Sequence, residues 1–355
     1  MFGLFGLLGV LVAGVVADTM MQMGSAADSD DDVLQDDAES ADVTDIQNIF
    51  GMLANRAAGE VDPIGTARTP ASDDSGQPIS TDVVTAPDAW MDVTGTTLAE
   101  NLNGLGGDDQ IIGGGGADLL DGRAGADTLL GEADNDYLHG ETGDDVLFGG
   151  HGEDVLHGEN GDDLMLGGPG NDTVFGHPGD DTLQGGAGSD SLVGGDGADI
   201  VSGDNGDDEI AGGSGDDVLH GGGGADVLDG GDGADTIWGQ MPDQADASAD
   251  FLNGGLGDDT LMLGAGDYGN GGEGHDTYGL IDFGLGEHPI QITDFNPAED
   301  ALMVLYDPHL HPDPQLSVES NTDQGMSTLL LDGVPLANLT NGAHLDLAAI
   351  TLRAA

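Results

Sequence analysis

The chain has no cysteine and no lysine, and aromatic residues make up only 4% of its 355 residues. The absence of cysteine excludes disulfides and thiolate metal sites. Four arginines oppose 69 acidic residues, so the formal net charge is −65. Because no basic patch can be assembled from so few positive side chains, nucleic acid and anionic membrane surfaces are excluded as partners. The natural partners of this chain are cations.

The small aromatic content and the 66 glycines argue against a large conventional core. Low hydrophobicity combined with a high net charge is typical of disordered chains. A folded protein of this composition requires its glycines and aspartates to be periodic, and the order of the residues decides between the two interpretations.

Residues 1–17 form an apolar run without a charge, at the lower length limit for a membrane span. The run also resembles the core of a signal peptide, but it lacks the basic residues that precede such a core. A signal, a membrane anchor and a buried helix all remain open. Residues 18–94 are predicted to be an acidic, largely disordered low-complexity linker. Within it, the capping-box spacing of Thr44 and Gln47 and a helical apolar period predict one helix at residues 45–56.

A nine-residue period begins at Gly104 and continues without a break for fifteen units to Trp238. Position one is glycine and position six is aspartate in all fifteen units, and position eight is always aliphatic or methionine. Position four is glycine in fourteen units, with Asp134 as the exception. Position five, in contrast, is aspartate in only six units. A bias in composition alone would not place aspartate at position six of every unit and leave position five variable, so the pattern indicates a folded array.

The repeat reads Gly-Gly-x-Gly-x-Asp-x-apolar-x, for example GGHGEDVLH at 149–157 and GGSGDDVLH at 212–220. It closely resembles the calcium-binding nonapeptide of the repeats-in-toxin (RTX, hemolysin-type) proteins. The resemblance implies an all-β fold, a parallel β-roll that is a right-handed β-solenoid with two units in each 18-residue coil. It places a turn at positions one to six and a short strand at positions six to nine of each unit.

The repeats divide the chain into further segments. We expect the main calcium-binding roll at residues 95–239, an insertion loop at 240–249, and a second short roll segment at 250–279. Residues 280–355 are then a C-terminal β-rich cap that also holds a secretion signal, as the resemblance implies. The cap should contain a tight Asp-Gly turn and four short strands, at 290–295, 301–306, 315–319 and 328–331.

The chemistry of the repeat independently favours calcium. Glycine permits positive φ angles, so the backbone can present its carbonyl oxygens inward, and one aspartate closes each turn. Ca²⁺ takes six to eight oxygen ligands and tolerates irregular geometry, so one turn supplies half of a shell and the turn stacked on it supplies the other half. On the order of a dozen Ca²⁺ ions are expected.

The candidate metal ligands are the position-six aspartates, which an 18-residue register arranges in two columns. One column contains Asp109, Asp127, Asp145, Asp163, Asp181, Asp199, Asp217 and Asp235. The other contains Asp118, Asp136, Asp154, Asp172, Asp190, Asp208 and Asp226, and the shorter array adds Asp250, Asp259 and Asp276.

Like charges on neighbouring strands, about 4.8 Å apart, cost roughly 0.9 kcal/mol per pair in water and about 3.5 kcal/mol at an effective dielectric constant of 20. The columns repeat this cost along the whole array. We therefore expect the array to be disordered without calcium.

Motifs for catalysis are absent from the sequence. It contains neither the HExxH zinc-protease motif nor the GxSxG nucleophile elbow, and no lysine is present for a P-loop. We predict that the chain is not an enzyme. The histidines of the array are interpreted as surface substitutions: His139, His151, His157, His177 and His220. The run His309-Leu310-His311-Pro312-Asp313 is a candidate for a second metal.

These observations predict a secreted, non-enzymatic calcium-binding protein whose roll acts as a structural, surface or adhesion element. Besides calcium, its expected partners are cell-surface or matrix components and the type I secretion machinery that the resemblance implies. The alternative is an accessory or vestigial toxin or enzyme component whose catalytic partner is a separate chain. The expected location is extracellular, with anchoring at the cell surface through residues 1–17 as the alternative.

Overall fold

The computed structural model describes residues 90–240, 248–282, 288–321, 326–340 and 345–354. The apolar segment 1–17, the helix expected at 45–56 and nearly all of the linker 18–94 lie outside the described residues.

Each repeat of the array except the last forms a six-residue strand that begins at position seven and continues through position three of the next unit. Examples are β7 (Val146–His151) and β8 (Val155–Asn160). The expected turn at positions one to six is therefore wrong, because only positions four to six turn. Positions two and three join the ladder since they pair with the preceding coil, as Gly150 does with Glu132.

Two short strands precede the unbroken array, β1 (Asp92–Thr94) and β2 (Asn101–Asn103). The remaining strands of the array are β3 (Gln110–Gly115), β4 (Leu119–Ala124), β5 (Thr128–Ala133), β6 (Tyr137–Thr142), β9 (Leu164–Pro169), β10 (Thr173–Pro178), β11 (Thr182–Ala187), β12 (Ser191–Asp196), β13 (Ile200–Asn205), β14 (Glu209–Ser214), β15 (Val218–Gly223), β16 (Val227–Asp232) and β17 (Thr236–Trp238).

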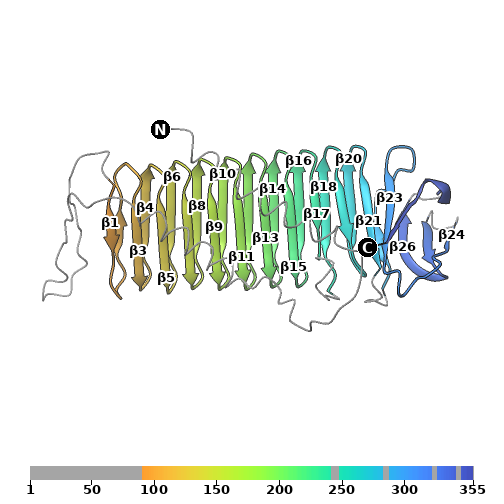
Figure 1. Cartoon of the computed structure of the whole chain (residues 1–355), viewed down its shortest axis with the longest axis horizontal. Helices are drawn as coiled ribbons and strands as arrows, with labels where there is room; N and C mark the ends of the chain where they lie inside the picture. Colours follow the sequence, from red (N-terminus) through yellow and green to blue (C-terminus); the bar gives the residue numbers. More distant parts are fainter. Residues whose placement is uncertain (1–89, 241–247, 283–287, 322–325, 341–344, 355) are drawn as a thin grey trace, which may run out of the picture. The chain divides into compact units, whose positions relative to one another are not determined.

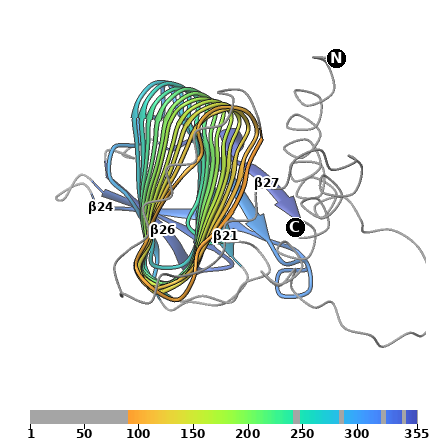
Figure 2. The same ribbon diagram turned by 90° about the vertical axis from the view of Figure 1, so that its left-hand side faces the viewer.

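Successive strands alternate between two sheets, one of 13 strands that holds the odd-numbered members of the array and one of 14 strands that holds the even-numbered members (Figure 1). Pairing is parallel, and Val146 lies opposite Leu164 one coil later. Seen along the stack, the coils superimpose as flattened loops (Figure 2). The predicted all-β parallel roll with two repeats per coil is confirmed.

The core lies between the two sheets and consists of the position-eight side chains. Because neighbouring residues of a strand point to opposite faces, positions eight and one face inward and positions seven and nine face outward. Leu147 and Leu156 are fully buried, as is the same position along the array up to Ile237. Each coil therefore contributes one aliphatic side chain from each sheet to a continuous row.

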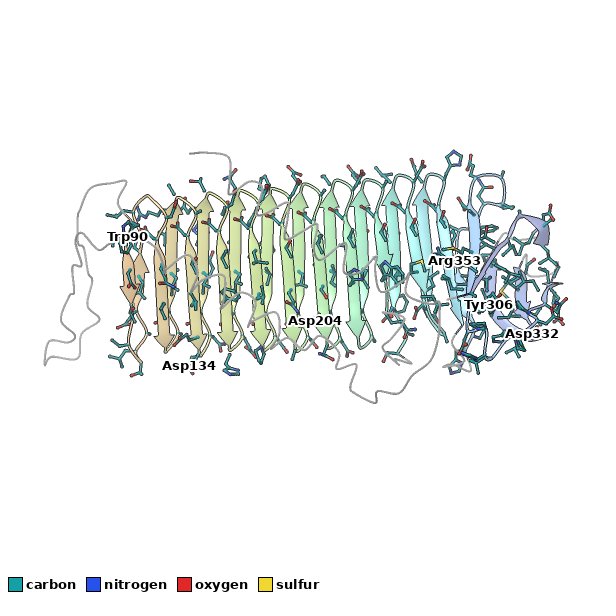
Figure 3. The ribbon with its side chains drawn as sticks, viewed as in Figure 1. Trp90, Asp134, Asp204, Tyr306, Asp332 and Arg353 are labelled. Atoms are coloured by element: carbon teal, nitrogen blue, oxygen red, sulfur yellow. The ribbon has the colours of Figure 1, made fainter. Side chains whose placement is uncertain are left out.

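Glycine at position four is required by the close stacking of the turns. Gly143 has φ 132°, and a Cβ there would overlap the carbonyl oxygen of Gly125 in the preceding coil. Asp134, the one exception, keeps a positive φ of 73°. Asp134 lies at the edge of the roll (Figure 3). Its Oδ2 accepts a hydrogen bond of 3.0 Å from the N–H of Gly116 one coil earlier, which compensates for the strain.

The roll continues across the expected insertion. The register increases from 18 to 24 residues there, so that Val227 pairs with Phe251 and Thr236 with Thr260. The strands that follow are β18 (Phe251–Leu256), β19 (Thr260–Leu263), β20 (Tyr268–Glu273) and β21 (Thr277–Asp282). They extend the same two sheets, so the expected second segment continues the first stack.

The C-terminal strands close the stack. They are β22 (Ile290–Ile292), β23 (Ala301–Tyr306), β24 (Leu316–Asn321), β25 (Met326–Leu331), β26 (Val334–Thr340) and β27 (Thr351–Ala354), with a 3₁₀ turn, η1, at Leu347–Ala349. The four predicted strands are all present, the first shorter than expected. β22 and β23 extend the sheets in parallel, whereas β24, β25 and β26 pair antiparallel. Asp332 and Gly333 both have positive φ, as the predicted tight turn requires.

The described part of the chain contains no helix of the length and apolar character needed to cross a membrane.

Phe295 fastens this cap to the last coil. Its side chain is 2% exposed, and its ring packs edge-on against the ring of Tyr278 with 6.0 Å between the two ring centroids. We predict that Phe295→Ala lowers the free energy of unfolding of the calcium-loaded protein by about 3–5 kcal/mol. Leu310→Ala, a cap residue that is 52% exposed, should change it by no more than about 0.5 kcal/mol. Urea denaturation followed by circular dichroism measures both, and equal losses would contradict this role of Phe295.

Candidate metal centre

The position-six aspartates lie at the end of each turn, directly before a strand begins. All eighteen predicted aspartates are buried, with at most 3% of any one exposed. The structure stacks them in two columns, with the aspartates of alternate repeats directly above one another. Burial of so many carboxyl groups requires a partner for each, because an unpaired buried charge is strongly unfavourable.

One oxygen of each carboxylate has a partner in the backbone. The N–H of Asp145 donates to Oδ1 of Asp163 at 2.7 Å, and the N–H of Asp163 donates to Oδ1 of Asp181 at 2.8 Å. The same bond repeats along both columns. These bonds fix the orientation of every carboxylate and hold its second oxygen inside the coil.

The second oxygen has no hydrogen-bond partner within the described part of the chain at fourteen of these residues. They are Asp118, Asp127, Asp136, Asp145, Asp154, Asp163, Asp172, Asp181, Asp190, Asp199, Asp208, Asp217, Asp235 and Asp259. An orphaned carboxylate oxygen in the interior costs more than the loss of an ordinary hydrogen bond. A regular series of such atoms indicates a ligand that binds oxygen.

The position-one glycines show where that ligand would fit. A Cβ added to Gly113 would lie 2.6 Å from Oδ2 of Asp118 and 3.0 Å from the carbonyl oxygen of Gly131, one coil later. A carboxylate oxygen and a carbonyl oxygen from two different coils therefore lie close together beside the glycine. Oxygen donors from stacked turns are the set that Ca²⁺ prefers, and the residues present fit this ion.

Burial raises the pKa of these aspartates, and neighbouring carboxylates raise it further, while the backbone donors oppose the shift. The pKa rises from 3.8 to about 8 for Asp163 and to about 7 for Asp145 and Asp181. A bound cation acts in the opposite direction because it favours the ionised form. The columns are therefore suited to a positive charge and unfavourable without one.

Two aspartates that continue the hydrogen-bond ladders of the columns were missed from the sequence. Asp267 is fully buried, and its Oδ1 accepts from the N–H of Asp250 at 3.1 Å. Its repeat is one residue short and has Gly269 where an aliphatic residue is expected, so the period did not reveal it. Leu263 fills the missing space, since a Cβ on Gly269 would lie 2.7 Å from its Cδ1. Asp300 accepts from the N–H of Asp276 at 3.2 Å.

A second, exposed ladder runs through position five. Oδ1 of Asp108 accepts from the N–H of Ala126 at 3.0 Å, and Oδ1 of Asn171 accepts from the N–H of Ser189 at 2.9 Å. The donor now lies one coil after the acceptor, the reverse of the buried columns. Because asparagine serves as well as aspartate, this ladder requires an acceptor oxygen and not a charge.

The histidines differ from one another in their surroundings. His151 is exposed, as predicted for a surface substitution. The prediction is wrong for His220, which is 6% exposed against Trp238, and burial lowers its pKa to about 4. In the run 309–313, Nδ1 of His311 lies 2.7 Å from Oδ2 of Asp332. The described residues gather no group of three metal-ligating side chains there.

The raised pKa values predict how metal-free protein responds to pH. The folded-state pKa of about 6–8 lies above the 3.8 of an unperturbed aspartate, so protons favour the folded state. This stabilisation is fully present below about pH 4 and is lost as the pH rises through 6–8. We expect metal-free protein to gain β-structure when the pH falls from 8 to 5, as measured by circular dichroism. The double variant Asp163→Asn/Asp181→Asn should respond less steeply. A β signal that stays constant or rises with pH would contradict the assignment.

Comparison with known proteins agrees with this geometry. The chain matches the family described as the RTX calcium-binding nonapeptide repeat (4 copies) at residues 94–129, 130–165, 166–201, 175–210, 202–237 and 244–269. No curated protein matches it. Among solved structures it is similar to the AlgE6R3 subunit of the Azotobacter vinelandii mannuronan C5-epimerase, with 25% identity over 42% of this chain and 80% of that one and a TM-score of 0.24. It is also similar to the extracellular lipase LipA of Serratia marcescens, with 15% identity over 64% of this chain and 45% of that one and a TM-score of 0.20. The family match and the stacked coils together establish that residues 94–269 belong to the RTX calcium-binding nonapeptide repeats.

Proposed function

We propose that this chain is a secreted, non-enzymatic calcium-binding protein whose roll becomes a rigid structural, surface or adhesion element when calcium fills the aspartate columns. One observation carries the proposal, namely the series of buried Oδ2 atoms without hydrogen-bond partners beside glycine carbonyl oxygens of the next coil. A chain that buried these groups for catalysis would need one site, whereas here the same arrangement repeats in every coil.

The calcium ligands are the eighteen buried position-six aspartates. Each supplies Oδ2, and the position-one glycines supply carbonyl oxygens. The ions, on the order of a dozen, neutralise carboxylates that otherwise repel one another along each column. Since each ion would join two coils, adding calcium should order the stack cooperatively.

A structural role is supported by the way the acidic side chains are used. The buried carboxylates accept hydrogen bonds from the backbone of a neighbouring coil, as Asp163 does from Asp145, and they are enclosed in the stacked turns. General acids, bases and nucleophiles must reach a substrate, which these groups do not. The outward-facing side chains of the two sheets remain available for cell-surface or matrix partners.

Export follows from the affinity expected of such sites. Extracellular calcium modules bind at about 10⁻⁴–10⁻³ M, far above the free calcium of a cytosol. A chain with a net charge of −65 would stay unfolded inside the cell and fold outside it. This behaviour suits passage through a type I secretion channel as an unfolded chain. The roll then acts outside the cell, either released or held at the surface through residues 1–17.

We expect calcium to convert the full chain from a largely disordered state to a β-rich one with a cooperative transition. Mg²⁺ should be far less effective, because it demands small octahedral sites. Circular dichroism titrations with the two ions at neutral pH measure the difference. A strong β signal in excess chelator, or equal responses to both ions, would refute the proposal.

Single aspartates of the two ladders provide a matched pair of variants. Asp181→Asn retains the Oδ1 atom that accepts from the N–H of Asp163 but removes a buried charge from a column, so it should release one or two ions and weaken calcium cooperativity without abolishing folding. Asp180→Asn makes the same change in the exposed ladder and should leave the number of bound ions and the calcium cooperativity unchanged. Calorimetric titration gives the ion count. Equal losses from the two variants would show that the buried column is not the calcium site.

The proposed location is tested by fractionating the producing cells and their medium, with mass spectrometry of the N-terminal peptide. We expect folded, calcium-loaded protein in the medium, or on the cell surface with residues 1–17 retained. Recovery of a second, catalytic chain bound to it would favour the accessory-component alternative. Folded, calcium-loaded protein in the cytosol would contradict both locations.

A further inference from the structure

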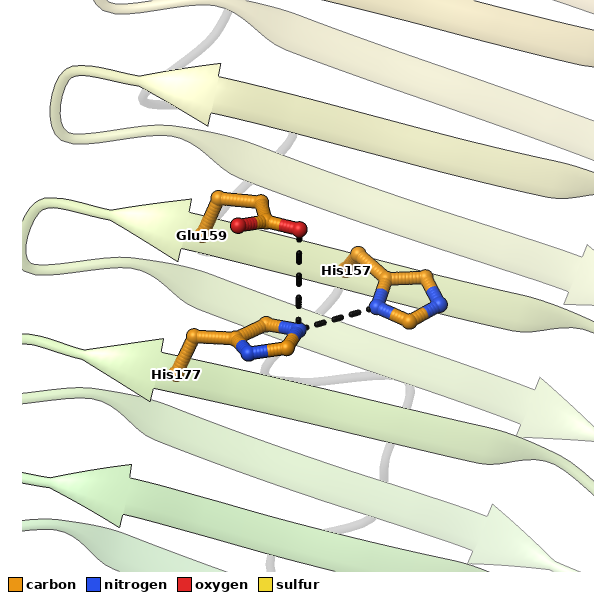
Figure 4. A group of neighbouring side chains, drawn as sticks. All are labelled: His157, Glu159 and His177. Atoms are coloured by element: carbon orange, nitrogen blue, oxygen red, sulfur yellow. Dashed lines mark hydrogen bonds and ion pairs between the residues drawn. The ribbon is translucent and has the colours of Figure 1, made fainter.

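Three metal-ligating side chains meet on the outer face of the even-numbered sheet, away from the aspartate columns. His157 and Glu159 lie on β8 and His177 on the neighbouring strand β10. Nδ1 of His157 is 3.0 Å from Nε2 of His177, which is 3.8 Å from Oε1 of Glu159 (Figure 4). All three side chains are partly buried, and their donor atoms lie within 4.8 Å of one another.

The spacing of these atoms suits a small transition-metal ion. Ligands 2.0–2.1 Å from a tetrahedral zinc ion are about 3.3 Å from each other, between the two distances observed here. Two imidazole nitrogens and one carboxylate oxygen form a ligand set that zinc accepts, with a fourth position left for water or another ligand. Calcium prefers oxygen ligands alone, so the chemistry differs from that of the columns.

The backbone at two of the three residues is strained. Glu159 and His177 both have φ 77° at position two, where other coils carry glycines such as Gly150 and Gly168. A Cβ on Gly168 would overlap the carbonyl oxygen of Gly150 in the preceding coil. A side chain in this left-handed region costs on the order of 1–2 kcal/mol. The same positive φ occurs at position two in Arg123, Glu132, Glu141 and Asp204, so this conformation belongs to the repeat position, and it places Glu159 and His177 one coil apart on the same face.

Neighbouring groups orient the donor atoms of this site and favour the protonation states that bind metal. The ring of His157 stacks on the ring of Phe175, with 4.9 Å between the ring centroids. Burial lowers the pKa of His157, and the nearby His177 and His139 lower it further. The lowered pKa favours the neutral form that binds metal. Nε2 of His139 lies 3.0 Å from Oε1 of Glu159, and this hydrogen bond lowers the pKa of the carboxyl group. Orientation of a ligand by such a contact typically strengthens a metal site.

We propose that His157, Glu159 and His177 form a binding site for a divalent transition-metal ion of the zinc class, separate from the calcium columns. The site goes beyond the proposed function and requires only that the coils carrying β8 and β10 are folded. It gives the outer face of the roll a second kind of metal chemistry and a coordination position that a group from another molecule can fill.

The test uses the full chain folded in excess calcium, so that the aspartate columns are filled before Zn²⁺ is added. Isothermal titration with Zn²⁺ should show a site that is lost from the double variant Glu159→Gly/His177→Gly, with an affinity loss of at least about a hundredfold. Both substitutions introduce the residue that position two prefers, so folding should be retained or improved. His157→Gln should also weaken the site while leaving both strained positions intact.

Glu132→Gly is the matched control. Glu132 has the same φ of 77° at the same repeat position, but it lies on β5 in the other sheet. The control therefore makes the same backbone and charge change as Glu159→Gly, one of the two substitutions of the double variant, and should bind Zn²⁺ like the parent chain. Parent-like Zn²⁺ binding by the double variant, or no binding by the parent chain at about 1 mM Zn²⁺, would overturn the proposal. Failure of calcium to fold the chain would be seen by circular dichroism before Zn²⁺ is added, so it would count against the calcium role instead.

Discussion

Each turn of the array buries one carboxylate whose two oxygens have different roles. Oδ1 accepts a backbone N–H from the preceding coil, as Asp163 does from Asp145, and this bond places Oδ2 beside the carbonyl oxygens of position-one glycines. The bond that stacks the coils therefore also stacks negative charges and buries them. A cation between coils relieves the repulsion and the lost hydration together, so folding of the roll and binding of calcium become a single process.

The constancy of the repeat follows from this arrangement. Position one must be glycine because a Cβ would occupy the space where the oxygens converge, as at Gly113. Position eight must be apolar because it fills the row between the sheets. Position five faces outward and varies: Asn171 there replaces aspartate without loss of the ladder bond, and other units have alanine, as at Ala126. The strict positions are therefore those that face the ion or the core, together with position four, where the stacked turns leave no room for a Cβ.

Much of this could be predicted from the sequence, since a nine-residue period in which every unit has the same role leaves little freedom of register. The two columns, the core row and the Asp332-Gly333 turn were all predicted. Asp267 was not, because the shortened unit hides its core residue and Leu263 fills the space from another position. The zinc-class site was also missed, because each histidine was interpreted alone. His157 and Glu159 lie two residues apart in one strand and therefore share a face. The 18-residue coil then places His177 beside Glu159 on the next strand. The site becomes visible only when the two-residue period of the strand and the 18-residue period of the coil are considered together.

The most direct test of the account is a crystal structure of the calcium-loaded chain with anomalous diffraction that locates the ions. The account predicts two rows of calcium peaks along the array, each peak between successive aspartates of a column and in contact with an Oδ2 atom. Peaks confined to the exposed position-five ladder, or buried columns whose Oδ2 atoms contact no ion, would contradict it.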